Sequence, residues 1–271
     1  MLTATIQTLG RWSGMVLLPS LILGCGTPDP TQAAVQQIID DLAAQRFGQA
    51  TARYRTEEKQ VLSDSAANVW RRALEHEDAT VREWAIDALS RIGDPEDIAA
   101  MVVGLDDPFR KVQEAAAEGL IRLDPETARE TFMERLKDAD RMKKIIAAQS
   151  LGELQDPRAV PLLIEQLIDS DLEPGTRGVI AQALARLADS RAAAPLADLA
   201  LDASADVQLR RNAAEALATL EGPAASAALQ RLLSSDDPYM RDLARRAGPR
   251  WPSARPLTEF FRTLLRLLPW V

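Results

Sequence analysis

Cysteine, histidine and aromatic residues are scarce in this 271-residue chain, and its 32 basic residues are outnumbered by 40 acidic ones. The single cysteine, Cys25, cannot form a disulfide within the chain, so the fold must depend on its apolar core. The single histidine, His76, stands beside Glu77, whereas a metal centre needs several converging ligands, so we expect no metal site. Aromatic residues make up 4% of the chain and hydrophobic residues 46%, which predicts a core of closely packed alanine and leucine.

Signals for nucleic-acid binding and for catalysis are also missing. The formal net charge is −8, and nucleic-acid phosphates demand a basic face, so we expect no nucleic-acid partner. The chain contains neither a Gly-x-Ser-x-Gly nucleophile motif nor a Gly-x-x-x-x-Gly-Lys-Ser/Thr phosphate loop. A serine–histidine–aspartate site would have to use His76 as its base, and no nucleophile motif supports that arrangement. We therefore predict no catalytic residues, no cofactor and no enzymatic activity.

What the chain does have is a repeat with a fixed period. Five leucines mark it, at spacings of 31, 31, 33 and 33 residues: Leu89, Leu120, Leu151, Leu184 and Leu217. A basic residue lies seven positions earlier in four of the five units, and Gln113 takes its place in the second: Arg82, Lys144, Arg177 and Arg210. A turn follows each leucine, and then a second apolar stripe. A fixed period of this size indicates a stacked repeat protein.

Each unit is predicted to contain two helices. In the third unit, apolar residues recur at helical spacing on both sides of the turn at Asp156-Pro157. The same pair recurs as Asp94-Pro95 and Asp124-Pro125, where an aspartate N-cap followed by proline suits the start of a helix. We interpret these aspartates as helix caps and not as metal ligands or catalytic groups. The acidic junctions between units lack the ligand set of a calcium loop and are interpreted as helix N-termini. The predicted fold is all-α, a solenoid of stacked helix pairs.

The repeat resembles HEAT repeats of the short bacterial type grouped with phycobilin-lyase-like proteins. The residues that carry the resemblance are Val81-Arg82, Ala88-Leu89 and Ile92-Gly93-Asp94-Pro95, and, in the third unit, Leu151-Gly152-Glu153-Leu154 followed by Asp156-Pro157-Arg158. It covers residues 79–248. Proline opens the second helix here, which disfavours a tetratricopeptide array, where proline follows it.

The resemblance implies a surface for a protein partner. It also leaves open an enzyme or enzyme subunit of the phycobilin-lyase-like group, a lyase or an oxidoreductase. One HEAT relative, deoxyhypusine hydroxylase, builds a di-iron centre from several His-Glu pairs, and this chain has only one such pair. An enzyme should show polar groups converging in a pocket of the concave surface. Second-helix positions that we expect on that surface are Val103, Glu134, Glu165, Leu199 and Arg231.

The start of the chain is predicted to be an export signal. Residues 1–24 hold one charge, Arg11, and a short apolar run that is too brief to span a membrane. The run ends in Leu21-Ile22-Leu23-Gly24-Cys25, which looks like a bacterial lipobox, in which the cysteine is diacylated and becomes the mature N-terminus. The alternative is a chance cysteine after an apolar N-terminus. Gly26 favours the periplasmic face of the outer membrane, and residues 25–32 are predicted to be a tether.

The repeats have predicted flanks on both sides. Residues 33–78 are expected to form a helical N-terminal cap that contains a degenerate repeat, with its second helix at 66–74. Residues 239–247 are expected to be the first helix of an incomplete sixth unit. Residues 249–271 are expected to form a linker and an amphipathic helix, with four arginines against one glutamate. That helix could cover the last repeat or lie on a membrane surface. Taken together, the sequence predicts a lipid-anchored scaffold of the bacterial cell envelope.

Overall fold

The computed structural model describes residues 29–247, and all of the regular structure in this range is helical. The first helices of the five units are α5 (Ala79–Ile92), α7 (Arg110–Leu123), α9 (Arg141–Leu154), α11 (Pro174–Leu187) and α13 (Val207–Thr219). The second helices are α6 (Ile98–Gly104), α8 (Pro125–Arg135), α10 (Val160–Ile168), α12 (Ala193–Leu201) and α14 (Pro223–Leu232). Short 3-10 turns lead into three of these second helices: η1 (Pro95–Asp97), η2 (Pro157–Ala159) and η3 (Ser190–Ala192). The predicted all-α solenoid of stacked helix pairs is confirmed.

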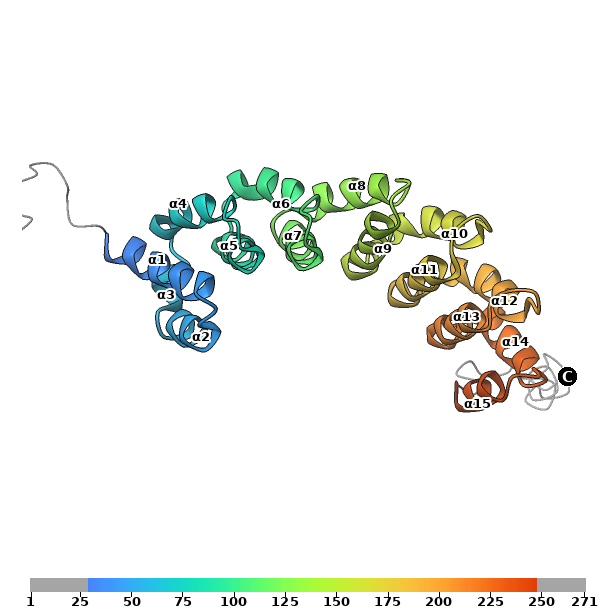
Figure 1. Ribbon diagram of the computed structural model, residues 1–271. Helices are drawn as coiled ribbons and strands as arrows, with labels where there is room; N and C mark the ends of the chain where they lie inside the picture. The colour runs from blue at the N-terminus through green and yellow to red at the C-terminus, as the bar shows by residue number, and fades with distance from the viewer. Residues whose placement is uncertain (1–28, 248–271) are drawn as a thin grey trace, which may run out of the picture.

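The helices form two rows that curve together into an arc (Figure 1). The first helices make up the inner row, on the concave side, and the second helices make up the outer row, on the convex side. The expectation that second-helix positions line the concave surface is therefore wrong. The physical reason is packing: successive first helices contact one another directly, whereas α6, α8 and α10 lie farther from their neighbours in the same row.

Small residues allow the first helices to approach so closely. Gly152 of α9 lies against α11, and a Cβ placed on it would be 3.0 Å from the Cα atom of Ala183. Gly178 of α11 likewise lies against the Asn212 side chain of α13. Because the inner row is spaced more tightly than the outer row, the array bends toward the first helices.

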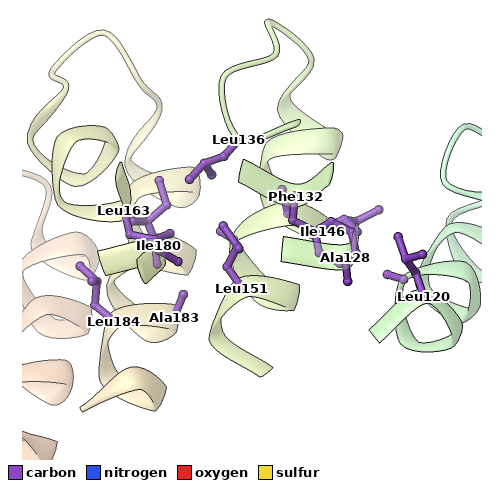
Figure 2. Close-up of a cluster of buried hydrophobic side chains, with 14 of the residues drawn as sticks. Leu120, Ala128, Phe132, Leu136, Ile146, Leu151, Leu163, Ile180, Ala183 and Leu184 are labelled. Atoms are coloured by element: carbon purple, nitrogen blue, oxygen red, sulfur yellow. The ribbon is translucent and has the colours of Figure 1, made fainter. Parts of the chain in front are cut away.

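The hydrophobic core fills the space between the two rows. Phe132 of α8 is fully buried beside Ile146 of α9, and in the next unit Leu163 of α10 lies near Ile180 of α11 (Figure 2). Fully burying a side chain of this size contributes roughly 1.5–3 kcal/mol. Since every unit adds such side chains to the same layer, the core is continuous along the solenoid.

Four helices precede the clear repeats: α1 (Pro30–Ala43), α2 (Phe47–Thr56), α3 (Glu58–Val61) and α4 (Asp64–Ala73). Helix α4 joins the outer row in front of α6, where a second helix would lie (Figure 1). Trp70 in α4 is fully buried, and its indole N–H donates to the Val61 carbonyl at 2.8 Å. At the other end, α15 (Pro238–Ala247) packs against α13 and α14 as the first helix of a sixth unit.

The turn aspartates act as caps, as predicted. The side chain of Asp94 accepts a hydrogen bond from the Glu96 amide at 3.0 Å, and Asp124, Asp156 and Asp189 do the same in their units. The residue that closes the preceding first helix has a left-handed backbone in three units, with φ of 87°, 52° and 50°: Gly93, Gln155 and Ala188. Glycine adopts this conformation freely, whereas Gln155 and Ala188 adopt it at a small cost in backbone free energy.

The basic residue seven positions before each repeat leucine also has a structural role. Lys144 is buried, and its Nζ donates to the Leu136 carbonyl at the end of α8, at 2.9 Å. Arg177 donates in the same way to the Leu167 carbonyl at 2.8 Å. Carbonyls at a helix C-terminus have no partner inside the helix and carry the negative end of its dipole. Gln113 donates to the Asp107 carbonyl at 2.6 Å, in the turn that follows α6, so in this unit an amide bonds the backbone in place of a basic side chain.

Some predicted segments lie outside the described residues: the export signal, Cys25 and the C-terminal amphipathic helix. Helix α1 begins at Pro30, inside the 25–32 segment expected to be a tether. Within 29–247, no helix combines the length and apolarity needed to cross a membrane.

Candidate functional site: the concave face

The concave face consists of the exposed side of the inner row, and its character changes along the arc. At α5 and α7 it is charged and carries aromatic side chains, whereas at α9 and α11 it is neutral. We name the first region the charged groove. It has a volume of about 370 Å³ and is lined by Tyr54 of α2, by Glu83, Trp84 and Asp87 of α5, and by Lys111, Glu114, Ala115, Glu118 and Arg122 of α7.

Two aromatic rings form one wall of the charged groove. The rings of Tyr54 and Trp84 meet edge to face, with centroids 5.3 Å apart and planes at 83°. The Arg91 guanidinium lies 5.5 Å from the Tyr54 ring centroid and donates to the phenol oxygen at 2.9 Å. Burial raises the pKa of Tyr54 to about 12, so the phenol stays neutral at physiological pH. Arg91 therefore holds the tyrosine of the aromatic wall in place.

The charges in the groove are only partly paired. Asp87 lies 3.7 Å from Arg122, and Glu114 lies 2.7 Å from Arg110, which stands outside the groove. Within the part of the chain that the structure describes, Glu83, Glu118 and Lys111 have no ion pair within 4.0 Å; their side chains are open to solvent or to a partner. Asp87 also lies 3.9 Å from Arg91, so the charged groups of the lining that remain unpaired among residues 29–247 are the two carboxylates of Glu83 and Glu118 and the ammonium of Lys111.

The neutral region follows on the next two helices. Its surface is formed by Ile145 and Gln149 of α9 and by Gly175 and Gln182 of α11. Ion pairs stand only at its two edges: Arg141 with Glu173 at 3.0 Å, and Arg186 with Glu153 at 3.1 Å. Glycine and glutamine leave this part of the concave face shallow, with amide groups as its hydrogen-bonding atoms.

Two grooves of the described residues lie on the convex face, between neighbouring helices of the outer row. One, of about 520 Å³, lies between α4 and α6 beside Val103, a side chain that is 73% exposed. The other, of about 580 Å³, lies between α10 and α12 beside Ile168, which is 62% exposed. Their polar linings include Arg82 and Arg177, which already bind backbone carbonyls, so these grooves offer fewer free polar groups than the charged groove.

The residues singled out in the sequence are dispersed in the structure. Glu134, Glu165 and Val103 are exposed on the convex row, and Leu199 is buried at 7% exposure. His76 belongs to the turn before α5, where its Nδ1 accepts a hydrogen bond from the Asp78 amide at 3.0 Å. Among residues 29–247, no cluster of three or more histidine, cysteine, aspartate or glutamate side chains is arranged to hold a metal ion. Cys25 precedes the described range.

Sequence reasoning missed the aromatic wall, although the repeat register contains a signal for it. Trp84 stands five positions before Leu89. The same position in the next four units holds smaller residues: Ala115, Ile146, Val179 and Asn212. A tryptophan where the repeat needs no large side chain could have identified the groove.

The chain matches known repeat proteins over most of its length. A family model described as HEAT repeats matches residues 27–121, 98–185 and 163–247. No curated protein matches the sequence at a significant level. Among solved structures, the complex of CpcE and CpcF of phycocyanin lyase from Nostoc sp. PCC7120 is 21% identical, with a TM-score of 0.45 over 66% of this chain and 74% of that chain. Human deoxyhypusine hydroxylase is 20% identical, with a TM-score of 0.40 over 80% of this chain and 95% of that chain. A designed armadillo repeat protein is 21% identical, with a TM-score of 0.42 over 66% of this chain and 96% of that chain. Likenesses at this level say nothing of function.

Proposed function

Since the chain belongs to the HEAT-repeat family, we propose that it is a non-catalytic scaffold whose concave face holds another protein. The observation that carries the proposal is the charged groove, where an aromatic wall and partly unpaired charges are exposed on the inner row. Tryptophan, tyrosine and arginine are the residues that most often dominate binding at protein interfaces. The non-catalytic part of the proposal depends on the single histidine and on the missing nucleophile and phosphate-loop motifs.

The scaffold function can be tested by crosslinking in native membranes with an amine-reactive reagent. Lys111 is the lysine that lines the charged groove, so we expect a protein to be crosslinked to it. A Lys111→Arg variant keeps the charge but removes the reactive amine, and should lose this product. Lys137 is exposed at the end of α8, so Lys137→Arg is the matched control and should retain it. A wild-type protein that yields no crosslinked partner would contradict the scaffold proposal.

We also propose that the scaffold is anchored in the bacterial envelope through a lipid on Cys25, with the periplasmic face of the outer membrane favoured. The support is the sequence: the single cysteine follows a short apolar run that is typical of a lipoprotein signal. The anchor is tested by metabolic labelling with a fatty acid. Wild type should incorporate the label, and Cys25→Ser should lose it and be released from membranes. Equal labelling of both proteins would rule out this site.

A further inference from the structure

We infer that the charged groove is a receptor for an arginine or lysine side chain of a basic segment in the partner protein. The inference rests on the proposed scaffold function, because it specifies the chemistry of the segment that the concave face holds. Three observations carry it: the position of Trp84, the two unpaired carboxylates, and the contrast with the neutral region beside the groove.

Trp84 is in place to receive a cation. It is half-buried, and the smaller residues at the same repeat position in other units show that helix packing does not require an indole there. The edge-to-face contact with the Tyr54 ring fixes the orientation of the indole, so little side-chain freedom remains to be lost on binding. A guanidinium or ammonium group over an indole is attracted by the partial negative charge on the face of the ring. Tryptophan is the strongest aromatic partner for this contact.

The carboxylates complete the complementarity. Glu83 neighbours Trp84 in the chain, and Glu118 stands one helix away on α7; neither has an ion-pair partner in the described structure. Two cations of the lining could compete. Arg122 is already engaged, since it donates to Ser90 Oγ and lies 3.7 Å from Asp87, and Lys111 makes no ion pair with either glutamate in the described structure. An incoming guanidinium can therefore pair with Glu83 and Glu118 without first displacing an existing partner.

The size and surroundings of the groove favour a side chain of a polypeptide over a larger ligand. Its volume of about 370 Å³ is at the small end of the range for ligand sites, which is roughly 300–1,000 Å³. Next to it, the neutral region exposes Gln149 and Gln182, whose amides can both donate and accept. A partner segment could thus continue from the cation site across α9 and α11 through hydrogen bonds that do not depend on charge.

The test uses the full-length protein and short synthetic peptides. One glycine–serine peptide carries two arginines, and its control carries citrulline, which has nearly the same shape but no charge. We expect the arginine peptide to bind at least about tenfold more tightly than the citrulline peptide, and to weaken as salt is added. Titration calorimetry measures both affinities. Failure of the arginine peptide to bind, or equal binding of the two peptides, would overturn the inference.

Variants then assign the binding to the groove. The double substitution Glu83→Gln and Glu118→Gln keeps side-chain size and should weaken the arginine peptide about tenfold. The double substitution Glu134→Gln and Glu165→Gln removes the same charge from the convex row and should leave affinity unchanged. Trp84→Leu should also weaken binding, with a thermal melt to verify the fold. Unchanged affinity in the Glu83 and Glu118 double variant would overturn the inference. If wild type and that double variant crosslink the same partner in equal yield, the cation site fails while the scaffold function stands.

Discussion

The inner and outer rows of the solenoid are built from the same repeat, yet they use different contacts. Helices α5, α7, α9 and α11 of the inner row each have 14 residues, whereas α6, α8, α10 and α12 of the outer row have 7, 11, 9 and 9. Inner helices contact one another through glycine and alanine, whereas outer helices leave grooves between them. The comparison shows that curvature comes from small residues in one row, and that this row also presents the longer, continuous face.

The largest expected effect concerns the layer that joins the rows. Phe132→Ala on α8 removes a fully buried ring, so the free energy of unfolding should fall by about 3–5 kcal/mol. Ile168→Ala on α10 removes a side chain that is 62% exposed in the same outer row, and should change stability by less than about 0.5 kcal/mol. Chemical denaturation of both variants measures the difference. Similar losses in the two proteins would mean that the core does not lie between the rows.

The next effect tests the close approach within the inner row. Gly152→Leu places a side chain where even a Cβ would lie 3.0 Å from the Ala183 backbone, so α9 and α11 must separate. We expect a loss of about 1–3 kcal/mol, the usual cost of overpacking. Gly48→Leu on α2 meets open space and should be neutral or slightly stabilising, since leucine favours a helix. A Gly152 variant as stable as wild type would refute the packing explanation of the curvature.

A third prediction compares two neighbouring lysines at the junction between rows. Lys144→Met leaves the Leu136 carbonyl and the Gln166 amide oxygen without their donor, and should cost about 1–3 kcal/mol. Lys143→Met breaks solvent-accessible pairs with Asp106, at 2.9 Å, and Asp138, at 3.6 Å, and should cost less than about 1 kcal/mol. Thermal melts of the two variants provide the measurement. Equal losses would show that the buried donor has no special role.

The smallest effect is a dependence of the free energy of unfolding on pH, to which several aspartates contribute. Burial acts to raise the pKa of Asp107, but hydrogen bonds from Arg82 and from the Phe109 amide outweigh it and hold the pKa below its usual value. The Arg211 guanidinium similarly lowers the pKa of Asp237. A carboxyl whose pKa is lowered by folding stabilises the protein above the unfolded pKa of about 3.9, and this contribution is lost as pH falls through the folded pKa.

The free energy of unfolding should therefore be constant above about pH 5 and decrease below about pH 4. Denaturant titrations across this range would show the decline, and Asp107→Asn should make it less steep. A free energy of unfolding that does not change between these pH values would contradict the role assigned to the aspartates.

Much of this fold could be predicted from the sequence because local signals and packing agree. The spacing of Leu89 and its counterparts predicted the units, and Asp-Pro predicted the turns with their caps. The basic residue before most of the leucines was visible as a pattern, but its partner is a backbone carbonyl at the end of the preceding helix or in the turn after it. A periodic pattern shows that a contact is repeated without showing which atoms make it.

The functional face was harder to predict for a physical reason. Which row becomes concave depends on the relative spacing of neighbouring helices, and that spacing follows from contacts such as Gly152 with Ala183 between separate units. Glu165 and Glu134 were assigned to the wrong face because amphipathic periodicity gives the buried side of a helix and not the direction of bending. The pairing of Trp84 with Tyr54 likewise joins helices that are distant in sequence.

The central claim is that the partner lies on the concave row. A photo-crosslinking amino acid placed at position 182 on α11 or at position 165 on α10 tests it directly, because both sites are exposed and lie on neighbouring helices of opposite rows. The full-length proteins are illuminated in intact cells, and the crosslinked products are compared. The account predicts a specific protein adduct from position 182 and none from position 165. An adduct from position 165 alone would place the partner on the convex row and contradict it.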